Sequence, residues 1–334
     1  MGGAISFPKF RERSPWRGGD LQTLRNVFFA PDAPKPGGAS RDLRLAMTDG
    51  TGDALACRVD WPGASGNLVS RETLVLVHGL GGSSESHYMV STARHWLDRG
   101  HPVVRVNLRG AGASGETCRL SYHAGRSEDL RDALRDLFAG EPELFAPGIA
   151  IVGFSLGGNM LLKFLAEYAG EFPLVWAASV SAPIDLTEAS RRFGSRRNRL
   201  YQRSILASLR RESLRTEAKL AGGERDAVIR AKSLLEFDEY FVAPRNGYSG
   251  AAEYYARNSS REFLSGIAVP TLLVQAHNDP WIPIDAYRDY PWGQAPKLTP
   301  LLPQGGGHVG FHGRGHREAW YNLCLAQFAE SCRA

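Results

Sequence analysis

The sequence has few cysteines and no long apolar run. Its 334 residues include four cysteines, Cys57, Cys118, Cys324 and Cys332, and no two of them form a Cys-x-x-Cys pair. This spacing excludes a disulfide framework and fits free thiols in a reducing compartment. No stretch reaches the ~20 apolar residues of a membrane-spanning helix, and the first residues lack the apolar core of a signal peptide. We therefore predict a cytoplasmic protein.

The chain is long enough for one large domain, and its pattern predicts an α/β fold. Hydrophobic residues make up 43% of the chain, enough to bury a sizeable core. From residue 73 onward, short apolar runs alternate with helical patterns, as in a mostly parallel sheet wound on both faces. We predict an N-terminal arm (1–40), an α/β core (41–186 and 264–334) and an inserted helical cap or lid (187–263).

A Gly-x-Ser-x-Gly motif at residues 153–157 is the most specific chemical signal in the chain. It follows the apolar run 149–152 and precedes a helical pattern over 159–165. This placement is typical of the nucleophile elbow of a serine hydrolase. Glycine tolerates the crowding of such a tight turn, and the following helix N-terminus favours developing negative charge near the hydroxyl. The motif predicts Ser155 as a nucleophile.

An acid and a histidine should follow the serine, each after a later strand. Asp279 follows the apolar run 271–276, and His308 lies in a glycine-rich loop after a last strand, 297–302, in which Pro300 indicates a sheet edge. His308 is the candidate general base and then acid, with Asp279 orienting its ring. Asp185, which also ends an apolar run, is an alternative acid, although capping of the next helix is the favoured interpretation.

The oxyanion hole requires two backbone N–H donors. One candidate is Leu156, which directly follows the predicted nucleophile. The other is Leu80, which lies in His78-Gly79-Leu80-Gly81-Gly82 after the apolar run 73–77. A glycine-rich loop at that position is the usual source of the second donor, and each donor typically contributes ~3–4 kcal/mol to lowering the barrier.

Two further patterns resemble ligand sites but do not support them. His308, His312 and His316 are spaced four apart, but sharing a face at that spacing needs a helix, and the surrounding glycines disfavour one. We predict no metal site, with His312 and His316 as solvated loop residues or a cap for the last helix. Residues 110–115 fit Gly-x-Gly-x-x-Gly, but the next helical pattern begins only at Glu128, so no dinucleotide cofactor is predicted.

The first part of the predicted cap is strongly basic. Between residues 187 and 232 there are 13 Lys or Arg against five acids, a net charge of +8 in a chain of net charge +5. A solvated helical face is the default interpretation, and a dock for anionic lipid or an acidic partner is the alternative. Nucleic acid is not expected, because no recognised reading module accompanies the charge. Some of the aromatic residues that follow are candidates to line an acyl pocket, although most should pack ordinarily: Phe237, Tyr240, Phe241, Tyr248, Tyr254 and Tyr255.

Taken together, the motifs resemble the AB hydrolase 4 family, the YheT-like group of α/β-hydrolases. The resemblance is carried by segments spread along the chain: 15–16, 19–24, 78–83, 107–110, 153–159, 183–186, 254–255, 278–280 and 306–311. It departs from the family at Asp20, where relatives tend to have histidine. The resemblance implies an α/β-hydrolase fold and a triad at Ser155, Asp279 and His308.

The implied activity is hydrolysis of acyl esters without a cofactor. Short- to medium-chain carboxylic esters, acylglycerols and phospholipids are the candidate substrates. Acyl transfer to an alcohol would use the same three residues. A catalytically silent binding protein on the same fold is the alternative of another class.

Overall fold

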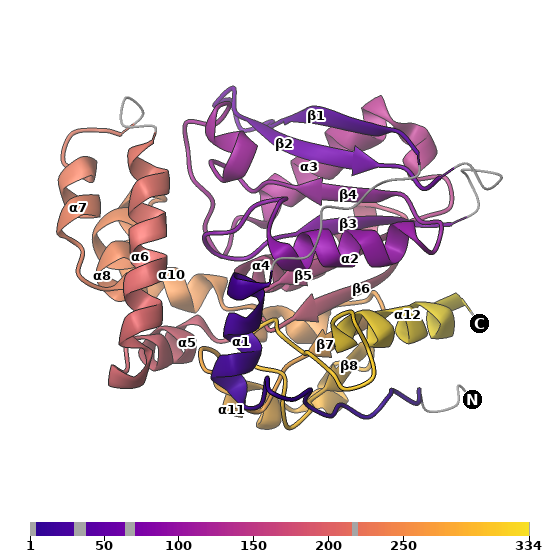
Figure 1. Cartoon of the computed structure of the whole chain (residues 1–334). Helices are drawn as coiled ribbons and strands as arrows, with labels where there is room; N and C mark the ends of the chain where they lie inside the picture. The colour runs from indigo at the N-terminus through magenta and orange to yellow at the C-terminus, as the bar shows by residue number, and fades with distance from the viewer. Residues whose placement is uncertain (1–4, 30–37, 64–70, 216–219, 334) are drawn as a thin grey trace.

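The computed structural model describes residues 5–29, 38–63, 71–215 and 220–333. Parts of the predicted arm (1–4 and 30–37), together with Glu217 and Lys219 of the basic segment, lie outside the described residues. A sheet of eight strands in the order β1-β2-β4-β3-β5-β6-β7-β8 forms its centre (Figure 1). The strands are β1 (Ser40–Ala46), β2 (Ala54–Asp60), β3 (Thr73–Val77), β4 (Val103–Val106), β5 (Ile149–Phe154), β6 (Leu174–Val180), β7 (Thr271–Val274) and β8 (Leu298–Leu301).

The sheet is mostly parallel, as predicted. β2 pairs antiparallel with β1 and with β4, whereas the pairs from β4 to β8 are all parallel. β8, which contains Pro300, forms the edge of the sheet, where a missing N–H is tolerated. The central strands β3, β4 and β5 are buried along their whole length, because helices cover both faces.

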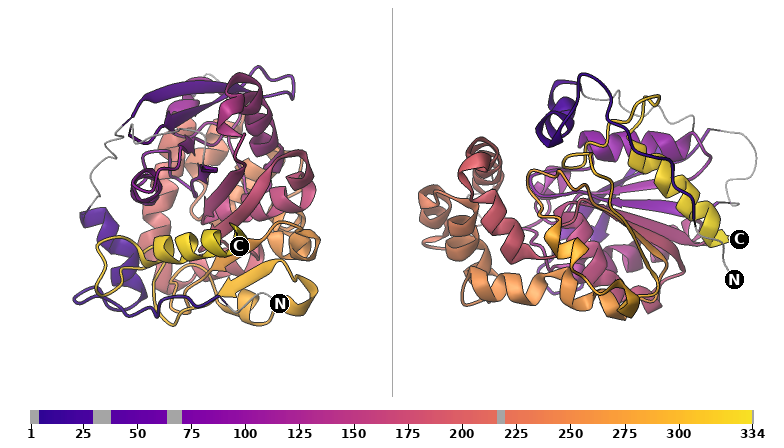
Figure 2. Two further views of the ribbon diagram at one scale, coloured as in Figure 1. Left: turned by 90° about the vertical axis from the view of Figure 1, so that its right-hand side faces the viewer. Right: turned by 90° about the horizontal axis from the view of Figure 1, so that it is seen from below.

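Alternate residues of each strand pack against helices on opposite faces. Leu74 and Leu76 of β3 belong to one apolar cluster with α2 (His87–Leu97) and α12 (Trp320–Arg333). Val75 and Val77 belong to the other, with α3 (Ser127–Gly140) and α4 (Leu156–Glu167). This follows from the two-residue period of a strand, and Figure 2 shows the two helical layers with the sheet between them.

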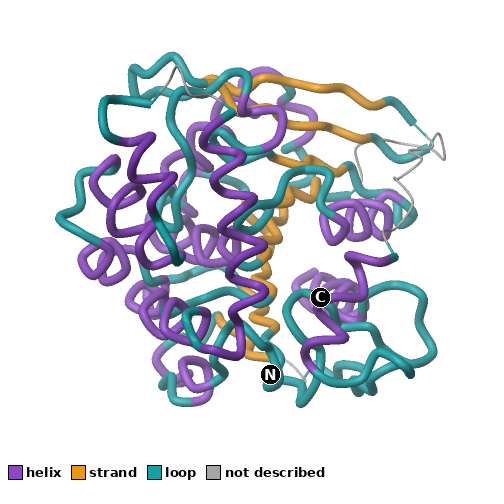
Figure 3. Tube along the Cα trace, turned by 60° about the vertical axis from the view of Figure 1, so that its left-hand side comes forward, coloured by secondary structure: helices purple, strands orange, loops and turns teal. Residues whose placement is uncertain are grey.

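The connection between β6 and β7 is mainly helical. It contains α5 (Leu186–Phe193), α6 (Arg199–Leu214), α7 (Glu224–Arg230), α8 (Leu234–Phe237), a π-helical turn (Asp238–Val242), α9 (Ala243–Arg245) and α10 (Ala251–Asn258). We call these elements the helical segment 186–258. They lie together beside one end of the sheet (Figures 1 and 3). Part of the segment packs around its own apolar cluster, which includes Leu206, Leu209, Phe237 and Phe241.

Two short helices complete the fold, α1 (Gly19–Phe28) near the N-terminus and α11 (Asp285–Arg288) after β7. The Gly-x-Gly-x-x-Gly stretch forms a 3₁₀ turn (Gly112–Gly115), and α3 begins only at Ser127. The next α-helix thus begins one residue before the predicted Glu128, and a 3₁₀ turn, not an α-helix, starts at these glycines. Across the described ranges, we find no helix with both the length and the apolar character needed to span a bilayer.

Candidate active site

Ser155 occupies a sharp turn between β5 and α4. Its φ of 50° and ψ of −124° are unusual for a residue with a side chain. A Cβ on Gly153 would lie 2.5 Å from the Gly157 carbonyl oxygen, and one on Gly157 would collide with the His78 carbonyl oxygen. Both positions therefore require glycine. The Ser155 N–H donates to the carbonyl of Val180 at 2.9 Å, which ties the turn to β6.

The structure brings Ser155, His308 and Asp279 into one hydrogen-bonded chain. His308 Nε2 lies 2.9 Å from Ser155 Oγ, and His308 Nδ1 lies 2.9 Å from Asp279 Oδ2. The second oxygen of Asp279 accepts hydrogen bonds from the backbone N–H groups of Trp281 (2.8 Å) and Ile282 (3.0 Å). His308 and Asp279 are both buried. The carboxylate is thus fixed on one side by backbone donors and on the other by the imidazole.

The alternative acid, Asp185, lies elsewhere in the hydrogen-bond network. It is the N-cap of α5, where its side chain accepts from the backbone N–H of Glu188 at 3.0 Å. This is the capping role that the sequence favoured.

The three clustered histidines do not share a helix, because residues 302–319 form loops and turns. His316 is exposed, as predicted, but the interpretation of His312 as a solvated residue is wrong. His312 is buried because α1 packs over its loop. Among the described residues, no three His, Cys, Asp or Glu side chains lie close enough together to hold a metal ion.

The N-terminal arm holds the loop that carries His308. The backbone N–H of His308 donates to Thr23 Oγ1 at 2.8 Å. Gln22 is completely buried; its Oε1 accepts from His312 N at 2.6 Å, while its Nε2 donates to the carbonyls of Trp16 and His312. Figure 1 shows α1 lying against the C-terminal loop. Gln22 and Thr23 belong to the segment 19–24 that carries part of the family resemblance, but nothing in the sequence indicated that this segment contacts the His308 loop.

Asp20 connects α1 to α6. Its carboxylate accepts from Arg197 Nη2 at 2.7 Å and from Tyr201 Oη at 3.0 Å. Tyr201 contacts Trp281 edge-on, with the ring centroids 5.3 Å apart. Trp281 in turn lies 4.2 Å from the His308 ring, centroid to centroid. A chain of contacts therefore runs from the arm through α6 to the histidine.

The glycine-rich loop after β3, residues 78–82, packs closely against Ser155. A Cβ on Gly79 would lie 2.8 Å from the Ser155 Cβ, so only glycine fits. Two tyrosines hold this loop: the partly buried Tyr88 accepts from the N–H of Gly79 at 2.9 Å, and the buried Tyr122 accepts from the N–H of Gly81 at 2.7 Å. Neither tyrosine belongs to a motif, so the sequence pattern did not indicate this role.

The two amides predicted to bind an oxyanion lie on either side of this contact. Leu80 follows Gly79 in the loop, and Leu156 follows Ser155 at the start of α4. Within the described residues, neither N–H makes a hydrogen bond, whereas the neighbouring N–H of Gly82 is engaged by the Gly79 carbonyl at 3.1 Å. Free donors next to a nucleophile suit the stabilisation of negative charge.

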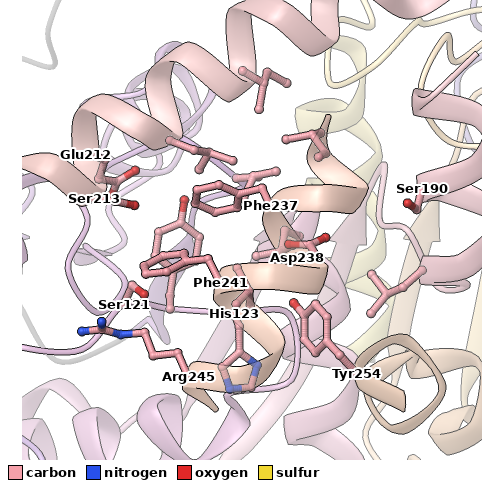
Figure 4. A pocket seen from close by; sticks show the side chains of 18 of the residues that line it. Ser121, His123, Ser190, Glu212, Ser213, Phe237, Asp238, Phe241, Arg245 and Tyr254 are labelled. Atoms are coloured by element: carbon pink, nitrogen blue, oxygen red, sulfur yellow. The ribbon is translucent and has the colours of Figure 1, made fainter. Parts of the chain in front are cut away.

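A cavity opens beside Ser155, between the core loops and the helical segment 186–258 (Figure 4). The space open to the centre of a water-sized sphere is about 170 Å³. Of the six aromatic candidates for an acyl pocket, Phe237, Phe241, Tyr254 and Tyr255 line it, but Tyr240 and Tyr248 do not. Tyr240 is 60% exposed, so it neither lines the cavity nor packs in the core. The expectation that most of the six pack ordinarily is wrong, because four of them line the cavity. Aliphatic side chains complete the lining, among them Leu80, Leu156, Leu186 and Leu209.

Titratable groups interrupt this apolar lining. Burial raises the pKa of Glu212 to about 7 and that of Asp238 to about 7. Tyr255 Oη donates to Asp238 Oδ2 at 2.6 Å, whereas Glu212 Oε1 has no partner in the described part of the chain. Burial lowers the pKa of His123 to about 3, which keeps that imidazole neutral. The cavity is therefore mainly apolar, with the buried acids Glu212 and Asp238, a neutral His123 and the arginines Arg119 and Arg245 in its lining.

Comparison with known proteins agrees with this architecture. A family model described as the alpha/beta hydrolase fold matches residues 72–314. YheT of Escherichia coli (strain K12), a provisionally named esterase, is 33% identical over 273 residues, which cover 81% of this chain and 78% of YheT. The phospholipase ABHD3 of Mus musculus is 28% identical, over 72% of this chain and 59% of its own length. The monoacylglycerol lipase of Saccharomyces cerevisiae is also 28% identical, over 78% of this chain and 59% of its own length.

Among solved structures, the Pyrococcus furiosus esterase Pf2001 superposes with a TM-score of 0.56. The match covers 98% of each chain at 14% sequence identity, so it concerns the fold alone.

Proposed function

This chain belongs to the α/β-hydrolase family and is a carboxylic ester hydrolase, and on that premise we propose that Ser155, His308 and Asp279 are its catalytic triad. The observation that carries the proposal is the hydrogen-bonded chain from Ser155 Oγ through His308 to Asp279, with two contacts of 2.9 Å. Its members follow the order serine, acid, histidine that is typical of this fold.

Ser155 Oγ attacks the ester carbonyl carbon while His308 Nε2 takes the hydroxyl proton. Asp279 accepts from Nδ1–H and stabilises the imidazolium. The N–H groups of Leu80 and Leu156 bind the oxygen that becomes negative in the tetrahedral intermediate. Collapse of the intermediate breaks the ester C–O bond, and His308 returns its proton to the leaving alcohol. Water, deprotonated by His308, then attacks the acyl-enzyme and releases the acid.

The lining of the cavity supports an acyl ester or lipid as the substrate. Leucine and aromatic side chains beside Ser155 favour a hydrocarbon chain. Relatives named as a phospholipase and a monoacylglycerol lipase point in the same direction. We infer short- to medium-chain carboxylic esters, acylglycerols or phospholipids as the substrate class.

Ser155→Ala tests the proposal most directly. Wild-type protein should hydrolyse p-nitrophenyl esters of graded chain length and be labelled by a fluorophosphonate probe, whereas Ser155→Ala should do neither. Ser190→Ala, which alters another serine of the same cavity, should still be labelled. Unlabelled wild-type protein would indicate a silent binding protein, and full activity of Ser155→Ala would refute the nucleophile. New ester formed in the presence of ethanol would identify acyl transfer.

The basic helical segment supports a second, finer proposal, contact with an anionic lipid surface. Leu200 on α6 is 78% exposed, and Arg196, Arg199 and Arg203 around it are exposed as well. An exposed apolar side chain among cations is typical of interfacial helices, and each basic residue near an anionic surface contributes about 1 kcal/mol.

Vesicle sedimentation tests this contact. The wild type should bind anionic vesicles more than neutral ones and be released by salt. Arg199→Ser with Arg203→Ser should reduce binding, whereas the control Arg44→Ser with Arg94→Ser, also exposed, should not. Equal sedimentation with neutral and anionic vesicles would refute the proposal.

A further inference from the structure

A second cavity lies between α1, α2 and residues 312–321, apart from the cavity beside Ser155. The space open to the centre of a water-sized sphere is about 190 Å³. Four of the described residues that line it are basic, Arg25, His87, His312 and Arg317, and none is acidic. The hydroxyl-bearing side chains of Tyr88 and Ser91 also reach it.

The positive charge around this cavity is not compensated by neighbouring carboxylates. Within the described ranges, Arg25, Arg317 and Arg13 form no ion pair. Burial lowers the pKa of Arg25, and the nearby charge of Arg13 lowers it further. Burial lowers the pKa of His312 to about 3 and that of His87 to about 4, so both imidazoles are neutral near pH 7. The positive charge here therefore comes from the arginines. The walls therefore repel further positive charge and favour an anion.

Two buried polar atoms at this cavity lack partners. His312 is only 7% exposed, and its Nε2 has no hydrogen-bond partner among the described residues. The buried Nε of Arg25 is likewise unpaired in that part of the chain. Most buried polar side-chain atoms in proteins have a partner. Both atoms are therefore free to donate hydrogen bonds to a ligand, His312 in its Nε2–H tautomer.

We propose that this cavity binds an oxyanion of the phosphate type, either free or as a phosphoester, through Arg25, Arg317 and His312. The guanidinium fork matches phosphate oxygens in geometry and charge. His87 is the first residue of α2, so the positive end of that helix lies close by. The proposal goes beyond ester hydrolysis and does not depend on it.

Binding here would connect two loops of the proposed active site. Tyr88, which lines the cavity, holds the N–H of Gly79 beside the predicted oxyanion donor. His312 lies on the loop of His308 and is clamped by Gln22. An anion that bridges Arg25 of α1 and His312 would therefore brace α1 against the histidine loop.

Isothermal titration with inorganic phosphate at constant ionic strength tests the site. The wild type should bind one phosphate per chain, and Arg25→Gln with Arg317→Gln should weaken binding at least tenfold. The matched control Arg44→Gln with Arg94→Gln removes the same charge from exposed positions and should bind like the wild type. No saturable binding by the wild type of either phosphate or glycerol 3-phosphate would overturn the proposal, as would an equal loss in the control. Binding of glycerol 3-phosphate alone would identify the phosphoester as the ligand.

A measurement on the unaltered chain covers the case in which the double variant fails to fold. The ring resonances of His312, assigned through His312→Gln, should shift saturably as phosphate is added to the wild type. Matched chloride should leave them in place. Resonances that do not move at saturating phosphate would also overturn the assignment.

Discussion

Replacing Thr23 with valine tests whether the N-terminal arm positions the proposed catalytic histidine. Valine keeps the shape of threonine but cannot accept the hydrogen bond that His308 N–H makes to Thr23 Oγ1 at 2.8 Å. A buried N–H without a partner costs about 1–3 kcal/mol. With ~2.1 cal/mol/K of unfolding entropy per residue, 334 residues give about 0.7 kcal/mol/K. The melting temperature should therefore fall by about 1.5–4 °C.

The same penalty should reduce the rate of ester hydrolysis. We expect this penalty to fall on the loop conformation that aligns His308 with Ser155. Since 1.4 kcal/mol corresponds to a tenfold loss in rate, kcat should drop about 5- to 140-fold. Turnover of a p-nitrophenyl ester and thermal unfolding are the two measurements. Thr23→Ser keeps the acceptor and should stay close to the wild type in both. Wild-type activity in Thr23→Val, or an equal loss in Thr23→Ser, would refute this reasoning.

Three further predictions follow from the site. Asp279→Asn should lower turnover about 10⁴-fold, as in other triads, while Asp185→Asn, which keeps a good helix cap, should remain active; the reverse result would exchange their roles. Burial raises the pKa of Glu212 to about 7, so the folded chain keeps a proton that the unfolded chain releases from about pH 4.5. Stability should therefore fall as pH rises across that interval, and Glu212→Gln should flatten the difference in melting temperature between pH 5 and pH 8; an unchanged pH dependence would contradict the assignment. Chelator treatment should leave esterase activity unchanged, whereas a loss restored by a stoichiometric metal would reopen the histidine cluster as a metal site.

The features that the sequence predicted correctly depend on backbone geometry within a few residues and on the order of the strands. The turn at Ser155 could be recognised because its glycines are required by backbone crowding within a few residues. The positions of Asp279 and His308 followed from strand order, because parallel strands place their carboxyl ends at the same edge of the sheet. The edge position of Pro300 and the capping by Asp185 rest on equally short-range physics.

Contacts between distant segments were not predictable in this way. Thr23 meets His308 across 285 residues, and no periodicity or motif encodes that pairing. The burial of His312 was missed for the same reason, because its glycine-rich surroundings resemble an exposed loop until α1 covers it. Glu212 lies on a helix whose basic composition resembled a solvated face, yet its carboxyl turns into the cavity (Figure 4).

The contacts between the arm and the His308 loop also determine when, during synthesis, the proposed active site can form. At about 5–20 residues per second, a ribosome exposes Thr23 and Gln22 roughly 15–60 s before their partners His308 and His312. All eight strands, β1 to β8, emerge during that interval, so the elbow with Ser155 precedes the residue proposed to activate it. A nascent chain should therefore remain inert toward esters until residues 307–312 have emerged and docked on α1. Esterase activity that appears on ribosome-bound chains would thus report emergence of this last loop.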